Sequence, residues 1–328
     1  MSRQSELAEL SRVYDSSALS NRNLIINGAM QCWQRGTSFS GNSAYNADRW
    51  KVDNNSGGGG QSTDAPDGFT YSLKIDTSSG NAALRQAIEL PAAGEGGVFR
   101  SGQKFTLSFY LKSDNAGEVI NIFIASSTTV DGTTTSQVND TSTGLTTTTS
   151  WTRYTYTFTS NNVGGSDTCY NIVPYVTTPS GAVYWTGFQL ELGSEATPFE
   201  HRSYGDELAR CQRYYSREET AAGGAYQRYG TGSWNSANAF ECLIPLSTPM
   251  RTTPALETTG TASDYAIYSA NAVDALTAIS ITNDSDAGTC NRSVALNMTT
   301  AGGGVAGEGG TLLANNDTDN FLALDAEF

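Results

Sequence analysis

The sequence is poor in the residues that metal sites and disulfide frameworks require. It contains a single histidine, His201, and its five cysteines form no C-x-x-C pair. These cysteines are Cys32, Cys169, Cys211, Cys242 and Cys290. Zinc sites use closely spaced Cys and His ligands, and an odd number of cysteines does not complete a disulfide framework. We therefore predict no metal site, no cofactor and free, buried thiols in a reducing compartment.

Basic residues and long apolar runs are also scarce. The chain has 19 Lys and Arg residues against 33 Asp and Glu residues, which gives a net charge of -14. Nucleic acids and anionic membranes are bound by clustered basic side chains, so this balance argues against both as partners. No apolar run approaches the roughly 18 residues of a membrane span. The opening MSRQSELAEL lacks a hydrophobic signal core, so we expect synthesis in a cytoplasm and no membrane insertion.

Catalytic motifs are missing as well. Neither G-x-S-x-G nor H-E-x-x-H occurs. His201 stands between Glu200 and Arg202, just before a predicted helix, which favours a structural role. A glycosidase needs two carboxylates across a cleft, and no pattern selects a pair among Asp48, Asp53, Glu89, Glu191 and Glu195. We predict that the protein is not an enzyme.

Glycine and small polar residues favour β structure. The chain has 34 glycines, and charged residues make up 16% of it, a composition typical of strands joined by turns. Apolar and polar residues alternate in several segments, as in strands that bury one face. The predicted strands of the first half lie near residues 23–26, 69–75, 105–111, 119–125, 154–158, 170–176 and 184–192. The turns between them include Gly57–Gly60 and Ser127–Gly144.

The stretch from Tyr184 to Tyr215 joins two predicted domains and reads YWTGFQLELGSEATPFEHRSYGDELARCQRYY. Ser203 with Asp206 three residues later predicts a helix that starts near Tyr204, because the hydroxyl accepts from a free N–H and the acid complements the helix dipole. One face of this helix is apolar, and it packs either on its own strands or on symmetry mates. The candidate oligomer contacts on this face are Leu208, Cys211 and Tyr215.

The predicted fold class is all-β, with two jelly-roll-like β-sandwich domains joined by a short helix and preceded by a short N-terminal helical peg. Leu7, Leu10 and Tyr14 lie on one face of this peg. An isolated helix of this length is marginal in water, so these residues are candidate docking contacts. The predicted domains are a docking segment 1–22, a jelly roll 23–202, a connector helix 203–217 and a small β domain 218–328.

Aromatic side chains outside the predicted framework are candidates for glycan binding, because sugar C–H surfaces pack on aromatic faces. The candidates are Trp151, Tyr226, Tyr229, Trp234, Tyr265 and Tyr268. For each of them, a core or interface anchor is the alternative. Trp33, Trp50 and Trp185 are assigned to the framework. The Asp- and Asn-rich loops lack the order of an EF-hand, which favours solvated turn acids over a calcium site.

Three segments resemble a module common in bacteriophage and prophage virion proteins, especially tail fibres and fibre-head proteins. They are NLIINGAMQCWQRGTSF, YNADRWKV and WTGFQLELGSEATPFEHRSYGDELARCQRYY, and the closing DAEF resembles the ending of such proteins. NLIINGAM and GFQLELG also resemble the first and last strands of carbohydrate-binding-module jelly rolls, which lie side by side. The resemblance covers about Asn23 to Tyr215 and carries over no individual ligand-binding residue.

The resemblance implies a virion structural protein of the tail-fibre or appendage kind, assembled in the host cytoplasm. It further implies a homotrimer, attachment to other virion proteins through the N-terminal peg, and host-surface glycan as a ligand. Phage depolymerases are usually repetitive β-helices, and the chain has no repeat of fixed period. A capsid-attached or collar decoration fibre and a glycan-cleaving tail enzyme are the alternatives.

Overall fold

The computed structural model describes residues 22–41, 44–55, 57–77, 80–90, 98–128, 134–160, 166–220, 224–270, 272–281 and 293–328. These residues form β strands and one α-helix, which confirms the all-β class. The predicted peg with Leu7, Leu10 and Tyr14 lies outside the described residues. No helix in the described ranges is long and apolar enough to cross a membrane.

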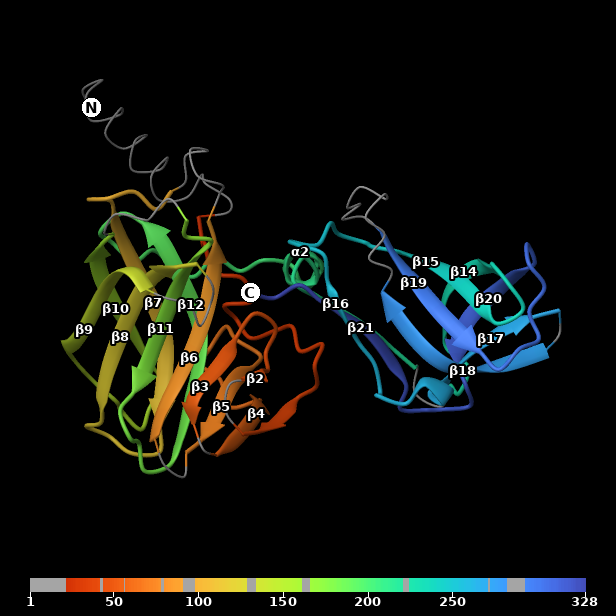
Figure 1. Cartoon of the computed structure of the whole chain (residues 1–328). Helices are drawn as coiled ribbons and strands as arrows, with labels where there is room; N and C mark the ends of the chain where they lie inside the picture. Colours follow the sequence, from red (N-terminus) through yellow and green to blue (C-terminus); the bar gives the residue numbers. More distant parts are fainter. Residues whose placement is uncertain are drawn as a thin grey trace, which may run out of the picture. The chain divides into compact units, whose positions relative to one another are not determined.

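The chain divides into two compact units, Met1–Glu207 with Phe328, and Leu208–Glu327 (Figure 1). The first unit contains two six-stranded antiparallel sheets. Sheet A has the order β1 (Ser38–Ser40), β4 (Gly58–Ser62), β5 (Ser72–Asp76), β12 (Ala182–Leu192), β7 (Lys104–Ser113) and β10 (Thr152–Thr159). Sheet B has the order β2 (Ala44–Tyr45), β3 (Lys51–Asn55), β6 (Gly80–Glu89), β11 (Cys169–Val176), β8 (Val119–Ser127) and β9 (Thr134–Thr146).

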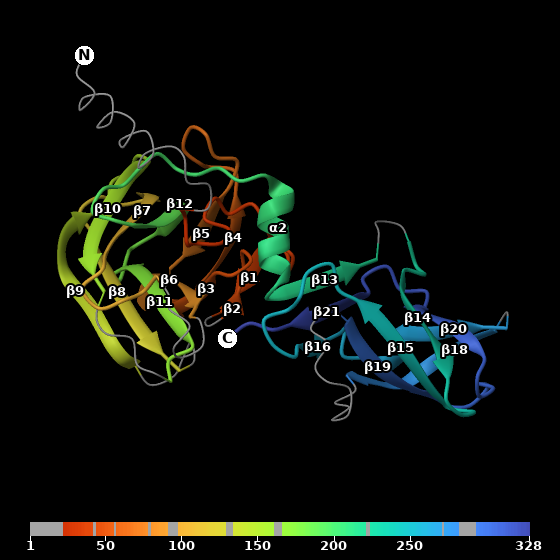
Figure 2. The same ribbon diagram turned by 90° about the horizontal axis from the view of Figure 1, so that it is seen from above.

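Alternating side chains of the two sheets meet in one apolar core. Phe105 and Phe109 of β7 and Ile122 of β8 are fully buried in the same cluster. The two sheets face each other across this core in Figure 2. Burying one such side chain contributes roughly 1.5–3 kcal/mol. Strands β5 to β8 alternate between the sheets, as do β9 to β12, so the unit is a β-sandwich of jelly-roll type.

The turn at Asn27 and Gly28 is a buried anchor of this sandwich. Asn27 is fully buried at a φ of 55°, a conformation that asparagine tolerates better than most residues. Its side-chain N–H groups donate to the carbonyls of Cys32 and Asp48 at 2.9 and 3.0 Å, and its Oδ1 accepts from the Cys32 N–H at 3.0 Å. A Cβ on Gly28 would lie 2.1 Å from the carbonyl oxygen of Phe188, so only glycine fits there.

The segment before this turn lies beside β12, as predicted, although it is not a strand. The Leu24 N–H donates to the Leu190 carbonyl at 3.0 Å. The Asn23 side chain replaces further ladder bonds, because its Oδ1 accepts from the Leu190 N–H and its Nδ2 donates to the Phe188 carbonyl, both at 3.0 Å. The Asn23 side-chain amide therefore takes the place of a backbone hydrogen-bonded pair beside β12.

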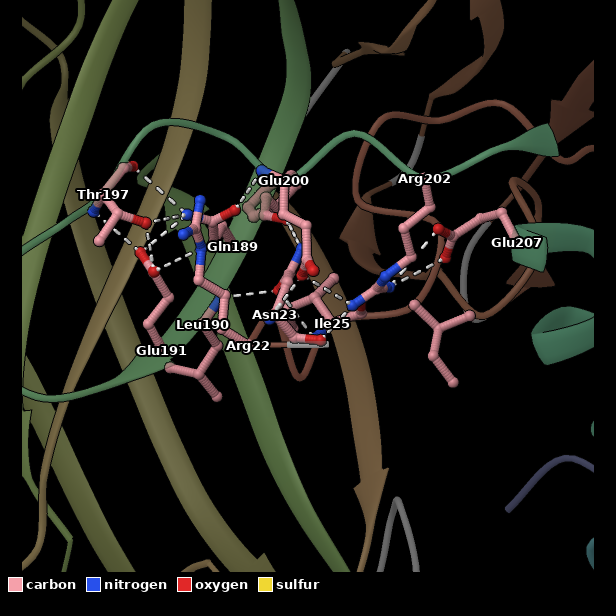
Figure 3. Close-up of polar contacts among 12 residues, drawn as sticks. Arg22, Asn23, Ile25, Gln189, Leu190, Glu191, Thr197, Glu200, Arg202 and Glu207 are labelled. Carbon is pink, nitrogen blue, oxygen red and sulfur yellow. Dashed lines mark hydrogen bonds and ion pairs between the residues drawn. The ribbon is translucent and has the colours of Figure 1, made fainter. Parts of the chain in front are cut away.

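A polar network continues from Asn23 to the segment that leads into the helix (Figure 3). Arg202 donates to the Ile25 carbonyl at 3.0 Å and pairs with Glu200 at 3.4 Å and Glu207 at 3.5 Å. Glu207 also accepts from the backbone N–H of Asn27. Figure 3 also shows hydrogen bonds around Glu191, whose carboxylate accepts from the Thr197 N–H at 3.0 Å. The residues that carry the virion resemblance are thus largely framework residues.

Helix α2 (Tyr204–Gln212) begins where the sequence predicts it. The Ser203 hydroxyl accepts from the Asp206 N–H at 3.2 Å and donates to the Asp206 carboxylate at 2.7 Å. The helix does not extend to residue 217, because β13 (Tyr215–Glu219) pairs with β21 (Phe321–Asp325). Two other predictions are corrected: the expected turns at Gly57–Gly60 and Ser127–Gly144 contain strands β4 and β9.

The second unit contains a closed barrel instead of the predicted sandwich. Its order is β14 (Arg228–Trp234), β15 (Ala239–Pro245), β19 (Ser293–Thr300), β18 (Ala272–Ile281), β17 (Tyr265–Ser269) and β20 (Gly309–Ala314). A separate sheet has the order β13, β21 and β16 (Ala255–Glu257). Strand β20 closes the barrel because it pairs with both β14 and β17. Its glycines permit this closure: a Cβ on Gly310 would lie 2.8 Å from the Phe240 ring.

Replacing Gly28 by alanine should destabilise the first unit, because the new Cβ would collide with the Phe188 backbone. We expect the free energy of unfolding to fall by about 1–3 kcal/mol, the usual cost of overpacking. Gly205→Ala is the matched control, since no atom lies within 4 Å of its Cβ position and alanine is a better helix former. Urea denaturation of both variants tests this. Equal stability of the two variants would contradict the role of Gly28.

Candidate functional site

The outer face of sheet B carries a hollow of about 230 Å³, which we call the sheet B hollow. It is lined by Asp53, Asn81, Ala83, Arg85, Phe123, Val173 and Tyr175. Side chains of a strand alternate between its two faces. Val52, Leu84, Ile122 and Ile172 belong to the core cluster, so the neighbouring positions point away from the core. Strands β3, β6, β8 and β11 thus build one surface.

Strand register brings two aromatic rings to this hollow. Tyr175 is the Cα partner of Ala83 on β6, and Val173 is the partner of Phe123 on β8. Both rings are half-buried. The small side chain of Ala83 leaves space beside Tyr175, which accounts for the hollow between the strands. A half-buried ring held by a sheet is a rigid surface for an apolar face of a ligand.

Charged and amide groups surround the rings. Arg85 Nε and Asp53 Oδ2 form an ion pair at 2.6 Å, with side chains 21% and 8% exposed. Asn81 Oδ1 accepts from the Thr178 N–H at 3.2 Å, which fixes the orientation of this amide. Planar carboxylate, guanidinium and amide groups beside aromatic rings are the set that recognises the hydroxyls and C–H faces of sugars. The chemistry of the sheet B hollow therefore fits a saccharide.

The same groups do not resemble a hydrolase site. Glycoside hydrolysis requires two carboxyl groups on opposite sides of the bond that is cleaved. Among the described residues that line the sheet B hollow, Asp53 is the one carboxylate, and it is paired with Arg85. The hollow offers recognition groups without an acid pair.

Two aromatic residues predicted to bind glycan belong to the core of the barrel. Trp234 is 1% exposed, and its indole N–H donates to Ser269 Oγ at 3.1 Å. Tyr265 is fully buried, and its hydroxyl donates to the Phe321 carbonyl. The ring faces of both residues are unavailable to a ligand. These two predictions are corrected, because closure of the barrel turns this face of β14 and β17 inward.

The other predicted aromatic residues do not line the sheet B hollow. Tyr226 is 55% exposed, and Tyr268 is half-buried. Tyr229 is half-buried, and its hydroxyl donates to Asn320 Oδ1 at 2.6 Å. Trp151 lies on the first unit, in contact with Asp64 and with Tyr184 of sheet A. A hollow of about 400 Å³ in the second unit is lined by apolar and hydroxyl residues of the segments 254–258 and 279–281, without an aromatic or charged side chain.

The candidate oligomer contacts are mostly buried by the chain itself. Cys211 is 0% and Tyr215 is 1% exposed, and the Tyr215 hydroxyl donates to Glu257 at 3.1 Å. These two side chains are therefore not available to a symmetry mate, which corrects their predicted role. Leu208, the third predicted contact, is half-buried.

Sequence reasoning missed the sheet B hollow. Tyr175 and Phe123 lie on predicted strands, but nothing in the sequence indicates that these two strands are neighbours. Arg85 lies on β6, a strand that was not predicted. The signal that was present is the alternation in β11, where Val173 and Tyr175 fall on the face opposite the core residues Ile172 and Val176.

Comparisons with known proteins locate similar folds only. No family model and no curated protein matches the chain. A bacteriophage CBA120 tailspike protein 4 domain matches with 15% identity and a TM-score of 0.34, over 52% of this chain and 22% of that chain. A putative sugar binding protein from Bacteroides thetaiotaomicron matches with 14% identity and a TM-score of 0.34, over 52% and 100%. TmCBM61, solved with β-1,4-galactotriose, matches with 16% identity and a TM-score of 0.30, over 53% and 100%. These TM-scores lie below 0.5, so no ligand is inferred from them.

Two tyrosines of the barrel, Tyr229 and Tyr265, should make the second unit sensitive to alkali. Burial raises the pKa of the Tyr229 hydroxyl above its usual 10.0, and burial also raises the pKa of Tyr265. The folded unit holds these protons more tightly than the unfolded chain does. The resulting stabilisation is complete below pH 10.0 and is lost as the pH rises through the folded pKa. We expect the free energy of unfolding to fall less steeply with pH in Tyr229→Phe.

Urea denaturation at several pH values above neutrality measures this slope. Tyr226→Phe is the matched control for removal of a tyrosine hydroxyl, because Tyr226 is 55% exposed. An identical slope in the wild type and in Tyr229→Phe would show that Tyr229 does not contribute.

Proposed function

We propose that the first unit binds a saccharide through the sheet B hollow. The observation that carries this proposal is the arrangement of Tyr175 and Phe123 beside the Asp53–Arg85 ion pair on the outer face of sheet B. The rings supply apolar faces for sugar C–H groups, and the ion pair supplies fixed donors and acceptors for hydroxyls. Strands hold these groups in place before a ligand arrives, which lowers the entropic cost of binding.

The wider role that we propose is a non-enzymatic virion protein of the tail-fibre or appendage kind, which presents its β units to glycan on a host surface. Its support is the resemblance of the segments around Asn23 and Tyr184–Tyr215 to virion modules, together with the sugar-compatible chemistry of the hollow. A capsid-attached or collar fibre fits the same residues. Imaging of labelled chain on a particle distinguishes these positions.

Replacing Tyr175 by alanine should weaken saccharide binding at the hollow by at least about tenfold, which corresponds to roughly 1.4 kcal/mol. The loss is expected because the ring presents the apolar surface beside Ala83. A glycan array identifies the saccharide that the wild-type chain binds, and calorimetry then measures its affinity and stoichiometry. Tyr204→Ala is the matched control, since Tyr204 is 57% exposed and does not line the hollow.

Two results would count against this proposal. The first is an isotherm for Tyr175→Ala that matches the wild type in both affinity and number of sites. The second is release of reducing ends from the bound glycan that Asp53→Asn abolishes, which would favour the glycan-cleaving alternative. Asp53→Asn keeps the size of the side chain, so a change in packing does not explain its effect.

Homotrimer assembly through a contact outside helix α2 is also part of the proposal. Because Cys211 and Tyr215 are buried by the chain itself, we expect Leu208→Asp to lower stability without changing assembly. Sedimentation velocity of the wild type and of Leu208→Asp tests both statements. A stable wild-type monomer at micromolar concentration contradicts the trimer, and conversion of a trimer to monomers by Leu208→Asp contradicts the placement of the contact.

A further inference from the structure

A second cluster of aromatic and charged side chains lies on the outer face of sheet A. Tyr184 on β12 is the Cα partner of both Lys74 on β5 and Lys112 on β7. Its neighbours Val183 and Trp185 belong to the core, so Tyr184 points away from it. Trp151, just before β10, contacts the Tyr184 ring edge to face, with centroids 6.4 Å apart. Asp64 completes this group, which we call the Trp151 cluster.

Polar contacts hold the two rings of the Trp151 cluster in place. The Trp151 indole N–H donates to Asp64 Oδ1 at 2.9 Å, and the other oxygen of Asp64 pairs with Lys112. The ammonium of Lys112 lies 5.1 Å and that of Lys74 lies 6.0 Å from the centre of the Tyr184 ring. Each ring is therefore oriented by contacts to at least two charged or aromatic groups.

These contacts are not part of the hydrophobic core. The side chains of Lys112 and Asp64 are 25% and 42% exposed, and both rings are half-buried. The hydrogen bond from Lys112 and the one from Trp151 hold the pKa of Asp64 below its usual value, so this carboxylate stays ionised and accepts hydrogen bonds in neutral solution. Rigid aromatic faces beside a charged acceptor and charged donors are a recognition surface without a role in the core.

We infer that the Trp151 cluster is a second saccharide site and that it takes a neutral sugar. The inference rests on the proposed function of the chain as a glycan binder, but it concerns a different sheet from the sheet B hollow. Trp151 presents an indole face to the ring of the sugar. Tyr184, whose ring lies under the ammonium groups of Lys74 and Lys112, holds Trp151 and both lysines in position. Asp64 accepts from its hydroxyls, and Lys112 donates to them with N–H groups that the single pairing with Asp64 does not use.

Charge balance selects a neutral ligand over an acidic one. The Lys112 ammonium is compensated by Asp64, and Lys74 pairs with Asp76 at 2.8 Å. An acidic sugar would have to displace one of these carboxylates to gain an ion pair. The net charge of -14 adds a general repulsion for polyanions. Hydroxyl groups can instead bind to the charged groups while the existing ion pairs stay intact.

Calorimetry on the full chain in a Tyr175→Ala background tests the second site, because this change disables the sheet B hollow. The probe is the neutral oligosaccharide with the strongest signal for the wild type on a glycan array. We expect the wild type to bind two molecules per chain and Tyr175→Ala to bind one. Adding Trp151→Ala should then weaken the remaining binding by at least about tenfold. Adding Trp151→Phe, which keeps a ring but loses the N–H bond to Asp64, should weaken it less.

The outcomes separate this inference from the proposed function. One molecule per chain in the wild type, with binding lost in Tyr175→Ala, overturns the second site and leaves the hollow in place. Binding that persists in Tyr175→Ala and is lost on Trp151→Ala supports the second site, whatever the state of the hollow. Silence of the wild type on the array overturns both, and stronger signals for acidic than for neutral glycans at the remaining site overturn its assigned ligand class.

Thermal unfolding of each variant shows whether a loss of binding results from a loss of folded structure. Trp151→Ala removes a tether of the loop that carries Asp64 and could lower the melting temperature. Tyr184→Leu keeps an apolar side chain on β12 and removes the ring that Trp151, Lys74 and Lys112 contact. Equal binding by Tyr175→Ala and by the Tyr175→Ala, Tyr184→Leu double variant, both folded, overturns the assignment.

Discussion

The buried amides of Asn23 and Asn27 are the contacts on which the first unit most depends. Both side chains satisfy backbone groups of distant segments, so removal of either amide leaves several buried donors and acceptors without partners. Asn23 joins the start of the sandwich to β12, the strand that also leads to helix α2, and Asn27 joins it to the segment from Cys32 to Asp48. The close approach of Gly28 to Phe188 follows from the same geometry. The hydrogen bonds of these two amides therefore hold together segments that are far apart in sequence.

The parts of the fold that could be predicted are those in which the residue types of one segment indicate its secondary structure without reference to its neighbours. Strand β7 alternates large apolar and polar side chains, and the start of α2 has a hydroxyl and an acid at the spacing that a helix start requires. Strand β9 reads TTSQVNDTSTGLT and has no such alternation, since its pairing with β8 defines it. Strand β4 is largely glycine and is likewise defined by its neighbours.

The candidate sites also depend on strand pairing, which the residue types of one segment do not reveal. Exposure of an aromatic residue depends on which way its strand faces, and closure of the barrel places Trp234 and Tyr265 inside while Tyr226 stays outside. No local pattern distinguishes these three residues. The sheet B hollow depends on the register of β3, β6, β11 and β8, which are distant in sequence. Trp151 could be named from its residue type alone, but its partners Asp64 and Tyr184 required the arrangement of sheet A.

The pairing of β13 with β21 has a consequence for the architecture of the second unit. These are its first and last strands, and Tyr215 is the Cα partner of Asp325. The entry and exit of the unit are thus separated by one strand spacing, about 5 Å. A unit whose ends adjoin in this way can be inserted into a surface loop of another protein, or circularly permuted, with little strain on its fold. The second unit can in this sense be transferred between proteins as a whole.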